Sequence, residues 1–298
     1  MKPETNAEAN AEIKPKIKAY LNRINFKGTP KNNYDTLKHL QMQHLRTVPY
    51  ENLDIVRNIP LSMEIADIYK KVVERRRGGY CFELNGLFGW LLKGLGFKVV
   101  DCMARYLRDG KEDPKRRHRV LKVTCEDMDY LCDVGMGTSI PQRPIPLIYG
   151  QIIEQIIGQK KEKYRLGKEP FYGNVLNEWK DGSWRRLYSF AEEERHNSDF
   201  SILSFYYENH PSSPFKVQDM VHMFTENGRK TLLGREFKIF SSKCTDKGSD
   251  IGSDIGLDIG TDKSPDNATE TIVPGTEKMF LELLKTHFGI ELGYSVSS

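Results

Sequence analysis

The sequence predicts an α+β protein in which helices come first and strands follow. Up to about Gly94, apolar residues recur at three- and four-residue steps, the spacing of one helix face. After Gly96 the chain changes to short runs rich in valine and aromatic residues, separated by turn residues, as expected of strands. The last apolar run, from about Thr276 to His287, predicts a closing helix.

The composition is that of a globular protein, with 38% hydrophobic and 29% charged residues among 298. This length allows a sizeable core and predicts two or three structural units. The net charge of +4 is small for the length and argues against a protein built wholly around nucleic acid. The N-terminus has no apolar signal segment, and no stretch of about 18 apolar residues occurs. We therefore expect a soluble cytoplasmic protein.

Four helices are expected in the first part of the chain. The first two are indicated by apolar residues at Ile17, Tyr20, Leu21 and Ile24, and then at Leu37, Leu40 and Leu45, with His44 on a neighbouring face. Residues 1–12 are of low complexity, and we expect them to be frayed. The third helix has Ser62 as its predicted N-cap and the glycines at 78–79 as its stop. The fourth carries Cys81 in its first turn.

Strands are expected at residues 97–107, 119–125 and 129–135, and two hairpins further on. In the first hairpin, Trp179 and Trp184 flank a Lys-Asp-Gly-Ser turn signal. In the second, the dipeptide Asn227-Gly228 marks the turn.

Neither calcium nor zinc is indicated. A Gly-x-Asp-Ile repeat lies in the segment 246–268, but its aspartate spacing fits neither an EF-hand nor a nonapeptide β-roll. We interpret this segment as a solvated insert. The five cysteines include no C-x-x-C pair and are odd in number, which argues against zinc and against a disulfide framework. We expect no metal.

Cys81 is the candidate nucleophile. A cysteine at a helix N-terminus has its thiolate favoured by the helix dipole and by free backbone N–H groups. Three arginines, at 75–77, precede it, and Gly78 and Gly79 allow a sharp turn and the approach of a substrate. The alternative is a buried cysteine that starts a core helix.

His118 and Asp133 are candidates for the base and its orienting acceptor, because a thiol nucleophile needs both. They lie 15 residues apart, in predicted strands on either side of a turn. A four-residue loop at Thr124–Asp127 would pair the two positions directly, whereas an odd-length loop would place the side chains on opposite faces.

The motifs together resemble the arylamine N-acetyltransferases. RGGYCFELN at 77–85 resembles the active-site segment of that family, and HLRTVPYENLDI at 44–55 resembles its His-x-x-x-Val-Pro-Phe/Tyr-Glu-Asn segment. His118 and Asp133 match the positions of its second and third catalytic residues. Residues 210–232 and the closing FGIEL resemble its third domain. The likeness runs from about residue 17 to residue 292, with Met136 standing where the family usually has phenylalanine.

The resemblance implies an α+β fold with a helical domain at 1–96, a β-barrel-like domain at 97–205 and a smaller α/β lid at 206–298. It implies a cysteine-protease-like Cys-His-Asp triad of Cys81, His118 and Asp133. Acetyl-CoA would acetylate Cys81, and an arylamine, arylhydrazine or hydroxylamine would then accept the acetyl group in a ping-pong mechanism. We expect Tyr80, Met136 and Gly137 to line the acceptor site.

Two further expectations concern charged residues. The basic run formed by Lys115, Arg116, Arg117 and Arg119 is either a solvated, nuclear-import-like turn or a contact for CoA phosphates. Ser212 and Ser213 are candidates for the same cofactor. We also expect Glu51 and Arg77 to pair in the core and fix the loop that bears Cys81.

Other functions remain open at this point. A cysteine hydrolase or transglutaminase-like enzyme would use the same triad without CoA, and a thioester hydrolase or amide synthase would change the acceptor or the acyl chain. A non-catalytic binding module would keep only the fold. No nucleic-acid or membrane partner is expected, and the oligomeric state is not indicated.

Overall fold

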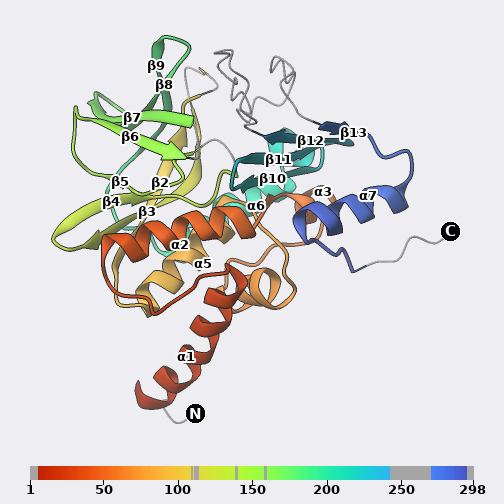
Figure 1. The fold of residues 1–298 in the computed structure, drawn as a ribbon, viewed down its shortest axis with the longest axis horizontal. Helices are drawn as coiled ribbons and strands as arrows, with labels where there is room; N and C mark the ends of the chain where they lie inside the picture. Colours follow the sequence, from red (N-terminus) through yellow and green to blue (C-terminus); the bar gives the residue numbers. More distant parts are fainter. Residues whose placement is uncertain are drawn as a thin grey trace.

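The computed structural model describes residues 6–108, 110, 114–137, 140–157, 160–241 and 270–293, so the predicted insert at 246–268 lies outside the described residues. The first part of the chain is helical (Figure 1). Its elements are α1 (Asn6–Arg23), α2 (Tyr34–Thr47), the short strand β1 (Tyr50–Glu51), α3 (Leu53–Val56), α4 (Ile65–Tyr69), the π-helical turn η1 (Lys70–Glu74) and α5 (Cys81–Gly94).

The predicted helices are present, with corrections at two of their starts. α1 begins at Asn6, so part of the segment expected to be frayed is helical. Ser62 is not an N-cap: α4 begins at Ile65 after Glu64, and the Ser62 hydroxyl accepts a hydrogen bond from the Glu64 N–H at 3.1 Å instead. α5 begins at Cys81 as predicted.

α5 is the central helix of this region. Almost all of its side chains are buried, and it packs against α1 on one side and against strands β2 and β3 on the other. The absence of a side chain at Gly89 brings the helix against Leu121 of β3, and Gly94 likewise meets Ile17 of α1. The helix is therefore fixed between the helical part and the first sheet.

The middle of the chain forms an eight-stranded antiparallel sheet that is nearly closed, like a barrel (Figure 1). Its order is β5-β4-β3-β2-β9-β8-β7-β6. The strands are β2 (Lys98–Tyr106), β3 (Arg116–Cys125), β4 (Met128–Cys132), β5 (Ile145–Pro146), β6 (Ile152–Ile157), β7 (Lys160–Glu169), β8 (Gly173–Lys180) and β9 (Ser183–Phe190).

The chain itself requires this curvature. The two edge strands, β5 and β6, follow one another and are joined only by residues 147–151. A flat sheet of this width would hold its edges about 33 Å apart, whereas such a link spans about 20 Å at most. The link also bonds to β7, where the Gly150 N–H donates to the Leu166 carbonyl at 2.8 Å.

The second sheet joins the helical part to the C-terminal part of the chain. Its order is β1-β10-β11-β12-β13, so the two-residue strand β1 of the helical part is its edge. The other strands are β10 (Met220–Thr225), β11 (Gly228–Leu233), β12 (Glu236–Ser241) and β13 (Glu270–Ile272). α7 (Glu277–Leu283) and the π-helical turn η3 (Leu284–Phe288) pack against it.

Both predicted hairpins are present. Trp179 pairs with Trp184, and their rings lie edge to face at 5.3 Å. In the other hairpin the turn is one residue earlier than predicted, because Gly228 already pairs with Thr225. Gly228 is needed for another reason: a Cβ there would lie 1.9 Å from the Phe240 carbonyl oxygen. Such a close backbone approach admits only glycine.

The two sheets are connected by α6 (Asn197–Asn209) and the 3₁₀ turn η2 (Pro214–Lys216). α6 crosses the boundary that was predicted between residues 205 and 206. The division into three domains remains a prediction. No helix in the described part of the chain is long and apolar enough to span a membrane.

Candidate active site

Cys81 is the first residue of α5 and is only 3% exposed. Its Sγ lies 3.5 Å from the Arg117 carbonyl oxygen and donates a hydrogen bond to it. Arg117 directly precedes His118 in β3, so the thiol lies against the strand that carries the predicted base.

His118 and Asp133 form a buried pair, as predicted. Their Nε2 and Oδ2 atoms are 2.6 Å apart, and the residues are 3% and 2% exposed. The second carboxylate oxygen of Asp133 accepts hydrogen bonds from Asn85 at 2.9 Å and from the Gly135 N–H at 2.8 Å. Both oxygens of this carboxylate are thus held by neighbouring groups, which fixes its orientation.

The β3–β4 hairpin that brings His118 and Asp133 together differs from the predicted one. The loop has two residues rather than four, Glu126 and Asp127, both with positive φ. The register pairs Leu121 with Cys132, so its continuation would set Asp133 opposite residue 120 instead of 118. Because the loop length is still even, the two side chains share a face, and they meet diagonally.

Asn85 is a positioning residue that the sequence reading did not single out. It lies one helical turn after Cys81, at position i+4, and therefore on the same side of α5. Its Nδ2 donates to Asp133 and, at 2.5 Å, to the Arg119 carbonyl, while its Oδ1 accepts from the Val134 N–H at 2.9 Å. That i+4 spacing was a signal available in the sequence.

Tyr188 of β9 completes the surroundings of the pair. Its ring centre lies 5.4 Å from that of His118, and its hydroxyl bonds Asp133. Burial, followed by the charge of Asp133, raises the pKa of Tyr188, so the phenol keeps its proton and acts as a donor. Nothing in the sequence places β9 beside β2, and this residue could not be found from it.

The resting thiol is neutral. Burial raises the pKa of Cys81, and the negative charge of Asp133 raises it further. The backbone N–H groups of Arg119 and Phe82 and the charge of Arg117 act in the opposite direction but are weaker. Desolvation therefore outweighs the preference for a thiolate that a helix N-terminus provides. The thiol needs a base to ionise.

A network of buried charges, which we call the ion cluster, fixes the segment before Cys81. It consists of Glu51, Asp54, Lys71, Arg77 and Glu83. Arg77 binds Glu51 through two bonds of 2.8 and 2.9 Å and Asp54 at 2.7 Å, which confirms the expected pair. Lys71 joins Asp54 at 2.8 Å to Glu83 at 2.9 Å.

The ion cluster reaches the backbone next to Cys81. Glu51 accepts from the Gly78 N–H at 3.2 Å, and Glu83 accepts from the Tyr80 N–H at 3.1 Å. A Cβ at Gly78 would lie 2.0 Å from the Pro49 carbonyl oxygen, so only glycine fits there. Burial lowers the pKa of Arg77, but Glu51 and Asp54 outweigh this effect and raise it overall. The Arg77 guanidinium therefore keeps its charge.

The predicted basic run divides into two pairs. Lys115 and Arg116 are exposed. Arg119 is buried and bound to Asp101, Asn197 and the Phe82 carbonyl, which excludes it from contact with a cofactor. Arg117 is also buried, with its guanidinium 4.7 Å from the centre of the Tyr106 ring.

Lys115 and Ser212, two of the residues expected to contact CoA, meet on the surface through α6. The Lys115 amine donates to the Tyr206 hydroxyl at 2.9 Å. The Tyr206 ring stacks on His210 with centres 4.6 Å apart, and His210 Nδ1 is 2.7 Å from the Ser212 hydroxyl. The Lys115 and Ser212 hydrogen bonds lower the pKa of Tyr206.

Ser213 is placed differently from what a cofactor contact needs. It is buried, its hydroxyl donates to the Tyr207 carbonyl at 2.5 Å, and the same oxygen accepts from the Phe215 N–H at 3.3 Å. The hydroxyl caps η2, and both of its hydrogen-bonding roles are taken.

Two of the three residues expected to line the acceptor site lie in the loop after Asp133. Met136 is half-buried, and Gly137 has a φ of +70°. A Cβ at Gly137 would lie 2.5 Å from His222, and one at Gly135 would lie 2.8 Å from the Cα of Cys81. This loop therefore covers Cys81 closely. Tyr80, in contrast, is fully buried, which makes it part of the core.

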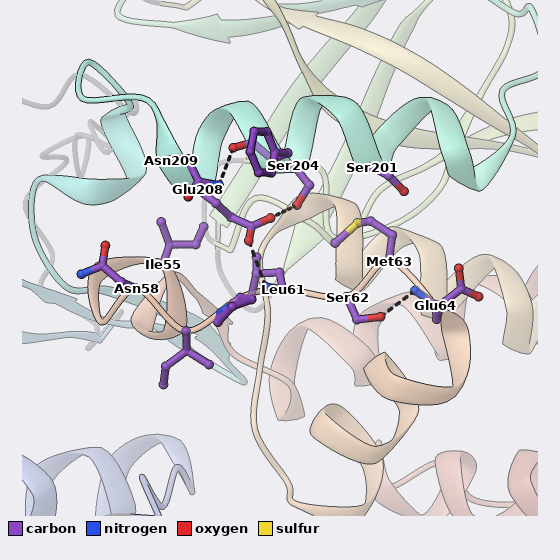
Figure 2. Close-up of a pocket in the computed structure, with 13 residues that line it drawn as sticks. Ile55, Asn58, Leu61, Ser62, Met63, Glu64, Ser201, Ser204, Glu208 and Asn209 are labelled. Carbon is purple, nitrogen blue, oxygen red and sulfur yellow. Dashed lines mark hydrogen bonds between the residues drawn. The ribbon is translucent and has the colours of Figure 1, made fainter.

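A cavity of about 460 Å³ lies between α6 and the segment 55–64 (Figure 2). Cys81, His118 and Asp133 are not among its lining residues. In Figure 2 the carboxylate of Glu208 is directed to Ser204 and to the Leu61 backbone, at 2.6 and 2.9 Å. Ser204 in turn accepts from the Tyr80 hydroxyl at 2.7 Å. Among the described residues, no group of three His, Cys, Asp or Glu side chains could hold a metal.

Comparison with known proteins places this chain in a family. The profile of the N-acetyltransferase family matches residues 33–296. The arylamine N-acetyltransferase of Mycolicibacterium smegmatis is 35% identical over 233 residues, which are 76% of this chain and 83% of the relative.

Solved structures agree. The M. smegmatis arylamine N-acetyltransferase superposes with a TM-score of 0.77 at 32% identity, over 93% of each chain. The Mycobacterium marinum arylamine N-acetyltransferase in complex with CoA gives 0.76 at 30% identity, over 92% of each chain. With a match of this extent in sequence and in fold, the chain belongs to the arylamine N-acetyltransferase family and is an acetyltransferase.

Proposed function

We propose that this enzyme transfers an acetyl group from acetyl-CoA to an arylamine, arylhydrazine or arylhydroxylamine through an acetyl-cysteine at Cys81. The observation that carries the proposal is the buried His118–Asp133 pair, 2.6 Å apart, on the strand against which the Cys81 thiol lies. The CoA complex of the M. marinum relative supports acetyl-CoA as the donor.

In the first half-reaction, the Cys81 sulfur attacks the thioester carbonyl while His118 takes the thiol proton. The tetrahedral adduct then collapses, the bond to the CoA sulfur breaks, and the imidazolium returns its proton to that sulfur as CoA leaves. Asp133 accepts the Nε2–H of His118, which leaves Nδ1 as the proton acceptor. Because the thiol is neutral at rest, His118 must take its proton for the sulfur to attack acetyl-CoA.

In the second half-reaction, the amine nitrogen attacks the acetyl carbonyl and loses a proton to His118. Collapse breaks the bond to the Cys81 sulfur, which regains its proton from the imidazolium. The products are the amide and the free enzyme. Asn85 and Tyr188 hold Asp133 through both halves, so the imidazole keeps one tautomer and one orientation.

For the CoA contact we propose Lys115, Arg116 and Ser212. Lys115 and Arg116 are exposed cations at the start of β3, and Ser212 lies near Lys115 through Tyr206 and His210. The variants Lys115→Met and Arg116→Met should each raise the KM for acetyl-CoA severalfold and flatten its salt dependence, because phosphate contacts are electrostatic. The exposed Lys98, substituted by Met, is the matched control. An unchanged KM in both variants would reject this placement.

The central test is intact-protein mass spectrometry after brief exposure to acetyl-CoA without acceptor. We expect one acetyl adduct that is lost in Cys81→Ala, retained in Cys125→Ala, and removed when an arylamine is added. An adduct that decays equally fast without amine would indicate a thioester hydrolase. No adduct with acetyl-, propionyl- or malonyl-CoA would contradict the proposal.

A further inference from the structure

Tyr50 occupies a constrained position beside the nucleophile. It forms β1 with Glu51, where it pairs with His222 of β10 on one side and makes a parallel bridge with Gly79 on the other. Gly79 is two residues before Cys81. The Tyr50 side chain is only 4% exposed, so its position is set by backbone contacts from two distant parts of the chain.

The hydroxyl of Tyr50 is buried and has no hydrogen-bond partner among the described residues. Buried hydroxyl groups are nearly always paired, because loss of hydration without a replacement bond destabilises the folded state. An exception at this position, next to a reactive thiol, is typical of a group whose partner arrives with the substrate.

The surroundings of Tyr50 are those of Cys81. A Cβ at Gly137 would lie 3.2 Å from the Cβ of Tyr50, and the same loop contacts Cys81 through Gly135. Burial and then the charge of Cys81 raise the pKa of Tyr50 well above its usual value. The phenol therefore keeps its proton in the presence of a thiolate and remains available as a neutral hydrogen-bond donor.

We propose that Tyr50 is a catalytic residue whose hydroxyl donates a hydrogen bond to the acetyl oxygen as a tetrahedral adduct forms on Cys81. This inference rests on the proposed acetyl transfer. The carbonyl oxygen becomes negative when sulfur or amine attacks, and it regains its double bond when the adduct collapses. The phenol proton stays on Tyr50 throughout, so both half-reactions use the same donor.

Such a donor contributes most in the transition state. A neutral carbonyl accepts a weaker hydrogen bond than an oxyanion does, and the difference is largest where water is excluded. Removal of the hydroxyl should therefore lower kcat more than it raises KM. Because the hydroxyl is unpaired at rest, its removal should also stabilise the folded protein. Removal of a purely structural hydroxyl would not lower kcat while it raises the stability of the folded protein.

The test compares Tyr50→Phe with Tyr20→Phe. Tyr20 is the matched control, since it too is fully buried with an unpaired hydroxyl but lies in α1. Both variants should raise the thermal midpoint by about 2 °C. Only Tyr50→Phe should slow acetylation of Cys81 and its transfer to amine, each about 10²-fold. Stopped-flow release of CoA and of product measures the two rates.

Several outcomes would overturn the proposal. These are unchanged rates in Tyr50→Phe, a loss confined to the amine step, and a fall in the midpoint, which would mean that the hydroxyl is paired at rest. Failure of the wild-type protein to form acetyl-Cys81 would reject the proposed function itself. The two failures are therefore distinguishable by the wild-type measurement.

Discussion

Two buried polar regions of the helical part are built in opposite ways. In the ion cluster before Cys81, each of the three carboxylates faces at least one cation at 2.9 Å or less. In the core between α1, α2 and α5, some buried polar atoms have no hydrogen-bond partner among the described residues. They are the hydroxyl of Tyr20, both ring nitrogens of His44 and the Oε1 of Gln41.

The contrast shows which part of the helical region is held by hydrogen bonds and ion pairs. The ion cluster holds the backbone at Gly78 and Tyr80 and so sets the position of Cys81. Around His44 the rings of Tyr20 and Phe88 supply packing, with centres at 6.0 and 5.4 Å, but no hydrogen bonds. Ion pairs and hydrogen bonds hold the segment next to Cys81, whereas ring packing surrounds His44.

The largest effect is expected from breaking the ion cluster. Arg77→Met leaves the carboxylates of Glu51 and Asp54 buried without their shared cation, which should lower the free energy of unfolding by about 3–5 kcal/mol. Urea unfolding measures this change. The matched control is Arg235→Met, which breaks the exposed pair with Glu277 and should cost about 1 kcal/mol or less. Equal losses in both variants would show that the cluster adds nothing beyond a surface pair.

A smaller effect on the free energy of unfolding, one that depends on pH, is expected at His44. Burial, followed by the charge of Arg23, lowers its pKa from 6.5 to about 3 in the folded protein. Below pH 3 both states are protonated, and above 6.5 neither is. Between these values only the unfolded chain takes up the proton, so the free energy of unfolding rises with pH by about 1.4 kcal/mol per unit.

The variant His44→Leu tests whether His44 causes this dependence on pH. It should remove that slope between pH 4 and 6 and make the protein more stable at pH 7, because two unpaired nitrogens disappear. His222, whose pKa burial lowers to about 4, should leave a residual slope in both proteins. Unfolding in urea at several pH values measures both. An identical slope in wild type and variant would mean that His44 does not titrate on unfolding.

Much of the fold was predictable because local patterns dominate it. The start of α5 at Cys81 followed from helical spacing and glycine placement, and the Trp179–Trp184 hairpin followed from its turn residues. The errors lie where two local signals compete. Ser62 can cap a helix, but its hydroxyl bonds Glu64 instead. The β3–β4 loop has two residues because Glu126 and Asp127 both adopt positive φ, which the sequence does not favour.

The His118–Asp133 pair was predictable from strand parity, but the residues that support it were not. The catalytic roles of Cys81, His118 and Asp133 stay a prediction. The basic run could not be resolved, because alternation along β3 does not tell which arginine finds a buried acid such as Asp101. Tyr188 and Tyr50 depend on pairing between distant strands, and one sequence carries no local trace of such pairing.

The two-residue strand β1 has a consequence for folding. Tyr50 takes its place only when it pairs with His222, and the segment that carries His222 is synthesised long after Tyr50. Contacts between such distant positions close a long loop and are among the slowest to form. During synthesis the helical part can assemble around α5 before β10 has been made. We therefore expect Tyr50, and Gly79 beside it, to reach their final positions only after β10 pairs with β1.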